Sequence, residues 1–203
     1  MLDAAARRLI DPPLDAIGRR LAALGIGADA VTLLGLALGL ISAALIAGGL
    51  FSLALAFLLA SRIADGLDGA IARAGRSTDF GGYLDITADF LFYGAVPLAF
   101  VWADPAGNGA AGGFLLASFY VNGATFLGFS VLAERHKMKT EVHGKKSLYF
   151  SEGLLEGTET ILFVVLICLW PTYFAVFAWI FGLLCFVTAL MRVLGARKIF
   201  GKD

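Results

Sequence analysis

Charge is scarce in this sequence. Only 16% of its 203 residues are charged, whereas charged residues make up about 25% of an ordinary soluble domain. Lysines and arginines balance aspartates and glutamates at a formal net charge of zero, so the chain lacks the basic excess of a nucleic-acid-binding protein. A disordered chain needs low hydrophobicity and a high net charge, and this sequence has neither.

Hydrophobic residues take the place of the missing charge. They make up 59% of the chain, and the mean hydropathy is +0.83. A soluble fold of this composition would expose far more apolar surface than soluble monomers do. The composition therefore predicts an all-α integral membrane protein with several spans.

Cysteine is also scarce. The two cysteines, Cys168 and Cys185, both lie in apolar segments that we expect at different depths in the membrane. A free cysteine in such a segment behaves as a small hydrophobic residue. We therefore expect two packing thiols and no disulfide.

Residues 1–27 differ from the rest in carrying several charges. Asp11, followed by two prolines, predicts a helix start. Apolar residues then recur at helical spacing, at Leu14, Ile17, Leu21 and Leu24, until Gly25 ends the run. This pattern predicts an amphipathic juxtamembrane helix, which lies either on the membrane surface or against the bundle.

Six apolar stretches follow, and about 20 such residues cross a bilayer. They occupy residues 31–50, 51–73, 81–102, 110–132, 152–170 and 172–193. The links at 48–49, 103–109 and 171 are so short that the spans on either side must be antiparallel. We therefore predict one domain over 1–203, with the juxtamembrane helix at 1–27 and six transmembrane helices at 28–203.

The positive charges predict the orientation of this bundle. All 16 lysines and arginines fall before the first span, in the region that joins the second span to the third (Arg62, Arg73 and Arg76), between the fourth and fifth, or near the end of the chain. The three links on the other side contain one charged residue, Asp104. The positive-inside rule then places both termini in the cytoplasm.

Four aspartates lie in or at the ends of the predicted spans: Asp65, Asp68, Asp85 and Asp89. A carboxylate within the membrane costs a few kcal/mol, about +2.5 to +3.5 on insertion scales. The spacings of three and four place each pair on one face of its helix, and the two antiparallel helices bring both pairs to the cytoplasmic ends. Grouped carboxylates suit Mg²⁺, Mn²⁺ or Ca²⁺. The alternative is that the acids form ion pairs with Arg62, Arg73 and Arg76.

The spacing of these acids follows a longer pattern. It reads Asp65-x-x-Asp68-Gly69-x-x-Ala72-Arg73, then seven residues, then Gly81-x-x-x-Asp85-x-x-x-Asp89. Average residue usage gives a chance match on the order of 10⁻¹⁰ per starting position. The pattern resembles the signature of the CDP-alcohol phosphotransferase family, integral membrane enzymes that also have a juxtamembrane helix and six spans.

The resemblance implies an activity and a role for each residue of the motif. Members of this family release CMP from a CDP-linked alcohol, usually CDP-diacylglycerol, by transferring its substituted phosphate to an acceptor hydroxyl during phospholipid synthesis. The resemblance implies metal ligation by Asp65, Asp68, Asp85 and possible ligation by Asp89, with two Mg²⁺ or Mn²⁺ ions, and it implies that Asp89 is the general base. It further implies nucleotide contacts at Gly69, Ala72, Arg73, Gly81 and Thr32. Ala28 and Asp29 depart from the family pattern, and a helix cap at Asp29 is an alternative.

The motif does not determine the acceptor. A basic link at 135–146 would suit a phosphorylated acceptor, although such a link also fits the positive-inside rule and attraction to anionic lipid. The acids Glu152, Glu156 and Glu159 share one helix face and would suit a cationic acceptor or an ion pair. We take as candidate acceptor contacts Lys146, Glu152, Glu156 and Arg192.

Two other classes of function compete with transfer. A divalent-cation transporter would use the same carboxylates, but its path needs polar groups in both halves of the membrane, and the outer halves here are apolar. A family-like scaffold without catalysis is the third class. By resemblance we also expect a homodimer in a bacterial inner membrane, with the active site facing the cytoplasm and with a CDP-linked lipid, a small polar alcohol and membrane lipids as partners.

Overall fold

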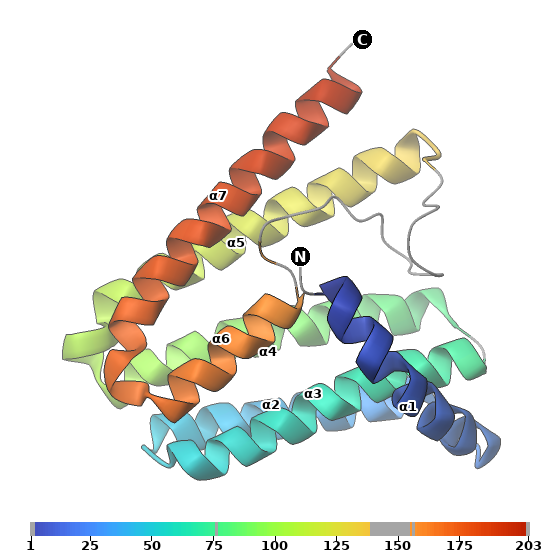
Figure 1. Ribbon diagram of the computed structural model, residues 1–203, viewed down its shortest axis with the longest axis horizontal. Helices are drawn as coiled ribbons and strands as arrows, with labels where there is room; N and C mark the ends of the chain where they lie inside the picture. The colour runs from blue at the N-terminus through green and yellow to red at the C-terminus, as the bar shows by residue number, and fades with distance from the viewer. Residues whose placement is uncertain (1–2, 76, 139–154, 156, 202–203) are drawn as a thin grey trace.

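The structure is a computed structural model, and it describes residues 3–75, 77–138, 155 and 157–201. This part of the chain is all helical (Figure 1). The helices are α1 (Asp3–Ala23), α2 (Ala28–Ala47), α3 (Phe51–Ala74), α4 (Asp79–Ala103), α5 (Pro105–Arg135), α6 (Gly157–Leu169) and α7 (Phe174–Phe200), with a short 3₁₀ turn, η1 (Pro171–Tyr173), before α7.

Six helices follow α1, one for each predicted span. Four segments are long and apolar enough to cross a membrane, namely α2, α4, α5 and Pro171–Phe200. α3 carries four charged residues, Arg62, Asp65, Asp68 and Arg73, and the described part of α6 has 13 residues. The count of six spans and the cytoplasmic placement of the termini therefore stay predictions.

The bundle is organised in two groups of helices, one of three helices and one of two. α2 packs against both α3 and α4, and α5 packs against α7. In Figure 1, α5 and α7 run side by side and extend obliquely away from α2 and α3. The main core is apolar and centres on fully buried aromatic and aliphatic side chains, including Phe92, Phe100, Phe174 and Ile167. Cys168 and Cys185 are both buried and free.

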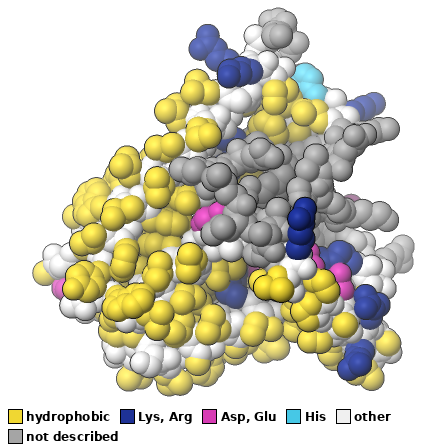
Figure 2. Space-filling view, in the orientation of Figure 1, with side chains coloured by type: hydrophobic (Ala, Val, Ile, Leu, Met, Phe, Trp, Pro, Cys, Tyr) yellow, Lys and Arg dark blue, Asp and Glu magenta, His cyan; other side chains and the backbone are white. Residues whose placement is uncertain are grey.

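The outer surface is apolar as well. Figure 2 shows hydrophobic side chains over much of the face in view, while lysines and arginines gather near α1 and the end of α7. Large exposed side chains such as Trp179, Ile180 and Leu183 follow one another on α7. Exposed apolar faces of this extent suit a lipid environment rather than water.

Small residues allow α2 to approach its neighbours closely. Gly35 lies against Ala64 of α3, and Gly39 lies against the Phe92 ring of α4. The hydroxyl of Ser61 on α3 donates a hydrogen bond of 2.7 Å to the carbonyl of Gly35. The pair Gly35 and Gly39, spaced by four residues, therefore packs within the protomer.

Two local expectations were wrong. The first helix begins at Asp3 and continues through Pro12 and Pro13, although these prolines indicated a start. The link at 103–109 is shorter than expected, because Asp104 accepts a hydrogen bond from the Gly107 amide and caps α5 from Pro105 onward. α1 does end before Gly25, whose φ of +80° suits a residue without a side chain. α1 packs on α3, where Gly18 of α1 lies against Ala70 of α3.

The close approach at Gly39 makes a prediction for stability. A methyl group at this position would lie 2.6 Å from Phe92 Cδ2, so Gly39→Ala must displace a buried ring. We expect an apparent loss of about 1–3 kcal/mol from overpacking, despite the gain of about 1 kcal/mol in helix propensity. Thermal unfolding in detergent measures this loss.

The matched control is Gly113→Ala on α5, where a methyl group meets nothing within 4 Å. Its melting temperature should stay equal or rise. Equal melting temperatures for the two variants would show that the contact between α2 and α4 does not constrain the fold.

Candidate active site

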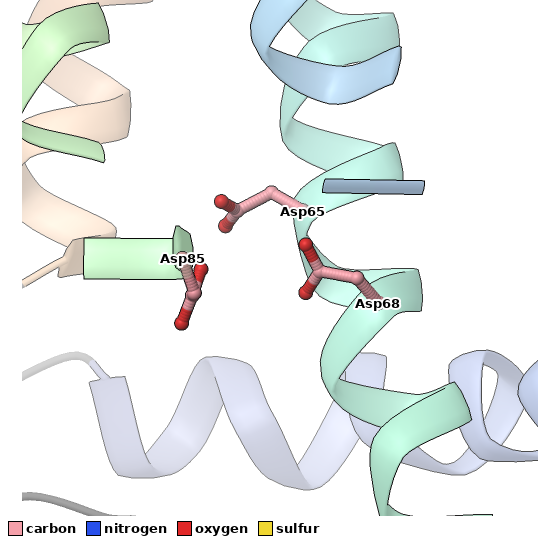
Figure 3. A group of neighbouring side chains, drawn as sticks. All are labelled: Asp65, Asp68 and Asp85. Carbon is pink, nitrogen blue, oxygen red and sulfur yellow. The ribbon is translucent and has the colours of Figure 1, made fainter. Parts of the chain in front are cut away.

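Three of the four motif aspartates converge between α3 and α4. One carboxylate oxygen from each of Asp65, Asp68 and Asp85 lies within 4.8 Å of those of the other two. Figure 3 shows Asp65 and Asp68, from successive turns of α3, facing Asp85 of α4. α4 is positioned at its start by Thr78, whose hydroxyl accepts a 2.9 Å hydrogen bond from the Gly81 amide. The convergence predicted from the spacing is confirmed for these three acids.

The burial of Asp68 indicates that the group fits a cation. Asp68 is 5% exposed, and its Oδ2 is buried without a hydrogen-bond partner among the described residues. A buried carboxylate oxygen without a partner is costly, about 1–3 kcal/mol or more for a charged group, and a bound cation removes that cost. Three hard carboxylates whose oxygens lie within 4.8 Å of one another suit Mg²⁺ or Mn²⁺.

Asp89 lies outside this group of three. Its Oδ1 accepts a hydrogen bond of 3.0 Å from Nη1 of Arg62, which also lies 3.5 Å from Oδ1 of Asp65. The alternative in which arginine pairs with the acids therefore holds for Arg62 and Asp89. The structure does not bring Asp89 into the metal-binding group that the resemblance implied.

The acids line one large cavity of about 1060 Å³. α2 to α5 and α7 all contribute to its walls, as do residues at the start of α6. The residues expected in metal or nucleotide binding all line it: Thr32, Asp65, Asp68, Gly69, Ala72, Arg73, Gly81, Asp85 and Asp89. So does Arg192, one of the candidate acceptor contacts.

The first turn of α2 also reaches this cavity. Ala28 and Asp29, which depart from the family pattern, both line it. Asp29 is not a cap, because α2 begins at Ala28 with Gly27 in the capping position. Its Oδ1 lies 2.9 Å from where a Cβ on Gly81 would stand, so a side chain at position 81 would displace the Asp29 carboxylate.

Arg73 lies at the rim of the cavity and contacts α1. Its Nη2 and Nε donate hydrogen bonds of 2.7 and 3.2 Å to Oδ1 of Asp15. The pair is partly exposed, so it contributes little to stability. It does orient the guanidinium of a motif residue from a helix outside the motif.

Arg192 lines the cavity from α7 and is fixed by residues of α5. Its Nη1 donates to the carbonyl oxygen and Oδ1 of Asn122 and to Oγ1 of Thr125, at 3.0, 2.9 and 3.1 Å. Arg192 is buried on α7, and its partners lie on α5. Neither partner was identified from the sequence, although a polar Asn122 within the apolar stretch 110–132 was a signal for it.

The other candidate acceptor contacts, Lys146, Glu152 and Glu156, lie outside the described residues. Several cavity residues were not predicted from the sequence. They are mostly aromatic and hydroxyl side chains: Tyr93, Phe119, Tyr120, Phe126, Thr158 and Thr160.

Known proteins resemble this chain over most of its length. It is 47% identical over 193 residues to inner membrane protein YnjF of Escherichia coli K12, which covers 95% of this chain and 94% of that protein. It is 28% identical over 200 residues to archaetidylinositol phosphate synthase of Pyrococcus horikoshii, with 95% of both chains covered.

Solved structures share the fold. Phosphatidylinositol phosphate synthase (PgsA1) of Mycobacterium tuberculosis, in a crystal structure with CDP-DAG bound, matches with a TM-score of 0.71 and 24% identity over 91% of this chain and 93% of that one. The crystal structure of PgsA1 with manganese and citrate matches with a TM-score of 0.69 and 24% identity, over 89% of this chain and 87% of that one.

The family profile for CDP-alcohol phosphatidyltransferases matches residues 26–191, which include the whole aspartate motif. This match favours a transferase over a cation transporter, and the apolar helices agree with an integral membrane protein. The aspartate motif, its cavity and this match together place the chain in the CDP-alcohol phosphatidyltransferase family.

Proposed function

We propose that this protein transfers the phosphatidyl group of CDP-diacylglycerol to the hydroxyl of a small polar alcohol and releases CMP. The observation that carries the proposal is the convergence of Asp65, Asp68 and Asp85 in a cavity that Asp89 also lines. The shared fold with PgsA1, solved with CDP-DAG bound, supports this choice of donor.

Asp65, Asp68 and Asp85 would hold the divalent metal, Mg²⁺ or Mn²⁺, and the family resemblance favours two ions. The metal would neutralise the charge of the donor diphosphate and stabilise the leaving phosphate. The unpartnered Oδ2 of Asp68 supports its role as a ligand. Proton transfer, nucleotide binding and acceptor binding would be carried out by other side chains of the cavity.

Asp89 would act as the general base. It lies one helical turn beyond Asp85 and lines the cavity, so its carboxylate can reach an acceptor hydroxyl that approaches the diphosphate. The hydroxyl proton passes to the Asp89 carboxylate while the acceptor oxygen forms a bond to the phosphorus of the phosphatidyl group. The bond from that phosphorus to the CMP oxygen breaks, and CMP leaves with the electron pair.

The nucleotide would lie over the small residues of the motif. Gly69, Ala72 and Gly81 line the cavity without long side chains, and Thr32 and Arg73 lie in the same wall. Arg73 offers a planar, permanently charged group that suits a phosphate. Its contact with Asp15 holds it at the rim.

The acceptor would bind toward α5 and α7. Arg192 is a buried cation in that wall, fixed by Asn122, and a fixed guanidinium suits an acceptor with a phosphate group. The similarity to archaetidylinositol phosphate synthase supports such an acceptor. Lys146, Glu152 and Glu156 remain proposed contacts.

The protein would work as a homodimer in a bacterial inner membrane with this cavity facing the cytoplasm. The distribution of lysines and arginines between the two sides of the membrane supports that orientation. The donor keeps its acyl chains in the bilayer while its diphosphate meets the metal, so the cavity has to open sideways toward lipid.

The first test is CMP release by purified protein in detergent with CDP-diacylglycerol and Mg²⁺. The acceptor panel should contain glycerol 3-phosphate, inositol, inositol phosphate, serine, ethanolamine and choline. We expect release with an acceptor that carries phosphate, and loss of release when a chelator removes the metal. Turnover that persists with chelator would contradict the metal-dependent mechanism.

A second test concerns the metal ligands. Asp68→Asn should weaken Mn²⁺ binding by more than about 10-fold, since even groups that only support a ligand cost about 10–100-fold. Without metal the variant should unfold at an equal or higher temperature, because a buried carboxylate without a partner is removed. Titration by electron paramagnetic resonance and thermal unfolding measure the two effects. Unchanged Mn²⁺ affinity would exclude Asp68 as a ligand.

A third test concerns the base. Asp89→Asn should lower kcat by about 10²–10⁴-fold, the usual contribution of a general base, while the affinity for the CDP-lipid changes little. Asp79→Asn is the matched control, because Asp79 is an exposed acid on the same helix and does not line the cavity. Near-normal kcat in Asp89→Asn would assign the proton transfer to another group.

A further inference from the structure

The amphipathic helix α1 lies across the motif helix α3 (Figure 1). Leu14 of α1 lies against Gly66 of α3, and Gly18 of α1 lies against Ala70. A Cβ added at either glycine would stand 2.7 Å from a side chain of the other helix, so small residues allow this close approach. Apolar contacts of this kind hold α1 on the motif helix.

A polar contact joins the same two helices. Oδ1 of Asp15, which follows Leu14 on α1, accepts hydrogen bonds from Nη2 and Nε of Arg73, at 2.7 and 3.2 Å. Asp15 is 36% exposed and Arg73 is 44% exposed, and a pair so open to solvent contributes little to stability. Arg73 lines the cavity, whereas Asp15 does not. The contact is therefore better explained by its effect on Arg73 than by its effect on the fold.

That effect is to orient the guanidinium of Arg73. Asp15 occupies the edge that Nε and Nη2 form. Nη1 lies over Gly69, at 3.3 Å from where a Cβ on that glycine would stand. Gly69 belongs to the motif and lines the cavity. The nitrogen that Asp15 does not use is thus held in the wall where the nucleotide is proposed to bind.

A guanidinium that is already oriented binds an anion more tightly than one that must be ordered by the ligand. Ordering one flexible side chain on binding lowers the affinity by about 2–10-fold, and the planar fork of arginine matches the geometry of a phosphate. By charge alone, an acid at the rim of the cavity would oppose an anionic ligand. The orienting effect and the charge effect of Asp15 therefore have opposite signs, and an experiment can separate them.

We infer that Asp15 is a positioning residue that holds Arg73 ready for a phosphate of the nucleotide. Through this contact α1 contributes to donor binding, although Asp15 itself lies outside both the motif and the cavity. The inference rests on the function proposed above, in which Arg73 contacts the nucleotide. It adds a residue of another helix to the determinants of nucleotide affinity.

The test compares Asp15→Ala with Asp11→Ala. Asp11 is an acid on the same helix, one turn earlier, and it does not line the cavity. Isothermal titration calorimetry on the full chain in detergent with Mg²⁺ measures the affinities for CMP and for CDP-diacylglycerol. Competition against CMP measures the affinity for cytidine, which has no phosphate. Thermal unfolding in the same detergent checks that both variants fold.

Asp15→Ala should bind CMP and CDP-diacylglycerol about 2–10-fold more weakly, because the ligand must now order Arg73. Its affinity for cytidine should not change, and its kcat at saturating donor should stay within about twofold, as expected when only binding is affected. Asp11→Ala should bind CMP equally well or slightly more tightly, since an acid is removed without disturbing Arg73. Unchanged or tighter CMP binding in Asp15→Ala, or an equal loss for cytidine, would overturn the inference.

The double variant Asp15→Ala with Arg73→Ala tests whether Asp15 acts through Arg73. Arg73→Ala alone should weaken CMP binding by about 10–100-fold, the usual loss for a charged hydrogen-bonding partner. If Asp15 acts only through Arg73, adding Asp15→Ala should cause no further loss. A further loss of more than about twofold would mean that Asp15 serves to dock α1 rather than to orient Arg73, contrary to the inference.

These results are separable from the proposed function. If the unmodified protein binds neither CMP nor CDP-diacylglycerol and releases no CMP with any acceptor, the proposed function fails, and the inference fails with it. If the unmodified protein binds both and is active, while Asp15→Ala matches Asp11→Ala in every measurement, only the inference about Asp15 fails.

Discussion

The repulsion among four carboxylates within an apolar bundle is the constraint on which this structure depends. Carboxylates whose oxygens lie within 4.8 Å of one another, as in Asp65, Asp68 and Asp85, cannot all remain ionised without compensation. Among the described residues, the Arg62 guanidinium lies between Asp65 and Asp89 and compensates part of this charge. Oδ2 of Asp68 is buried without a hydrogen-bond partner among the described residues, and this is where the proposed metal ion would supply the compensation.

The packing of the bundle holds that cation in place. Gly39 has no side chain, so the Phe92 ring can lie against α2, and the same ring lies against the Arg62 guanidinium. Ser61 donates to the carbonyl of Gly35 and accepts from Arg62. Small residues that pack the helices thus also determine where the Arg62 guanidinium stands, and that guanidinium donates a hydrogen bond to Asp89.

The sequence predicts the parts of this architecture that depend on local pattern. The apolar stretches predicted the helices. The spacing of the acids predicted the convergence of Asp65, Asp68 and Asp85, because helix geometry determines which residues share a face. The helix ends were less predictable: α1 runs through Pro12 and Pro13, and α5 begins directly after Asp104. Those ends depend on capping contacts and packing that spacing does not encode.

Contacts between distant helices were the least predictable part. Arg62, Arg73 and Arg76 were equivalent as partners for the acids in the sequence, yet Arg62 pairs with Asp89 while Arg73 pairs with Asp15 of α1. Likewise, nothing local connects Arg192 to Asn122, 70 residues earlier. Such choices follow from the three-dimensional packing of α1 on α3 and of α5 on α7.

The same packing separates the two tasks proposed for the cavity, metal and nucleotide binding on one side and acceptor binding on the other. The acids and the small residues of the motif lie on α3 and α4, which α2 holds together. Arg192 lies on α7 and is fixed by α5, a pair of helices without motif residues. Because α5 and α7 pack mainly on each other, side chains there can change without moving the carboxylates. We therefore expect relatives that share the aspartate motif to differ in acceptor through residues of α5 and α7.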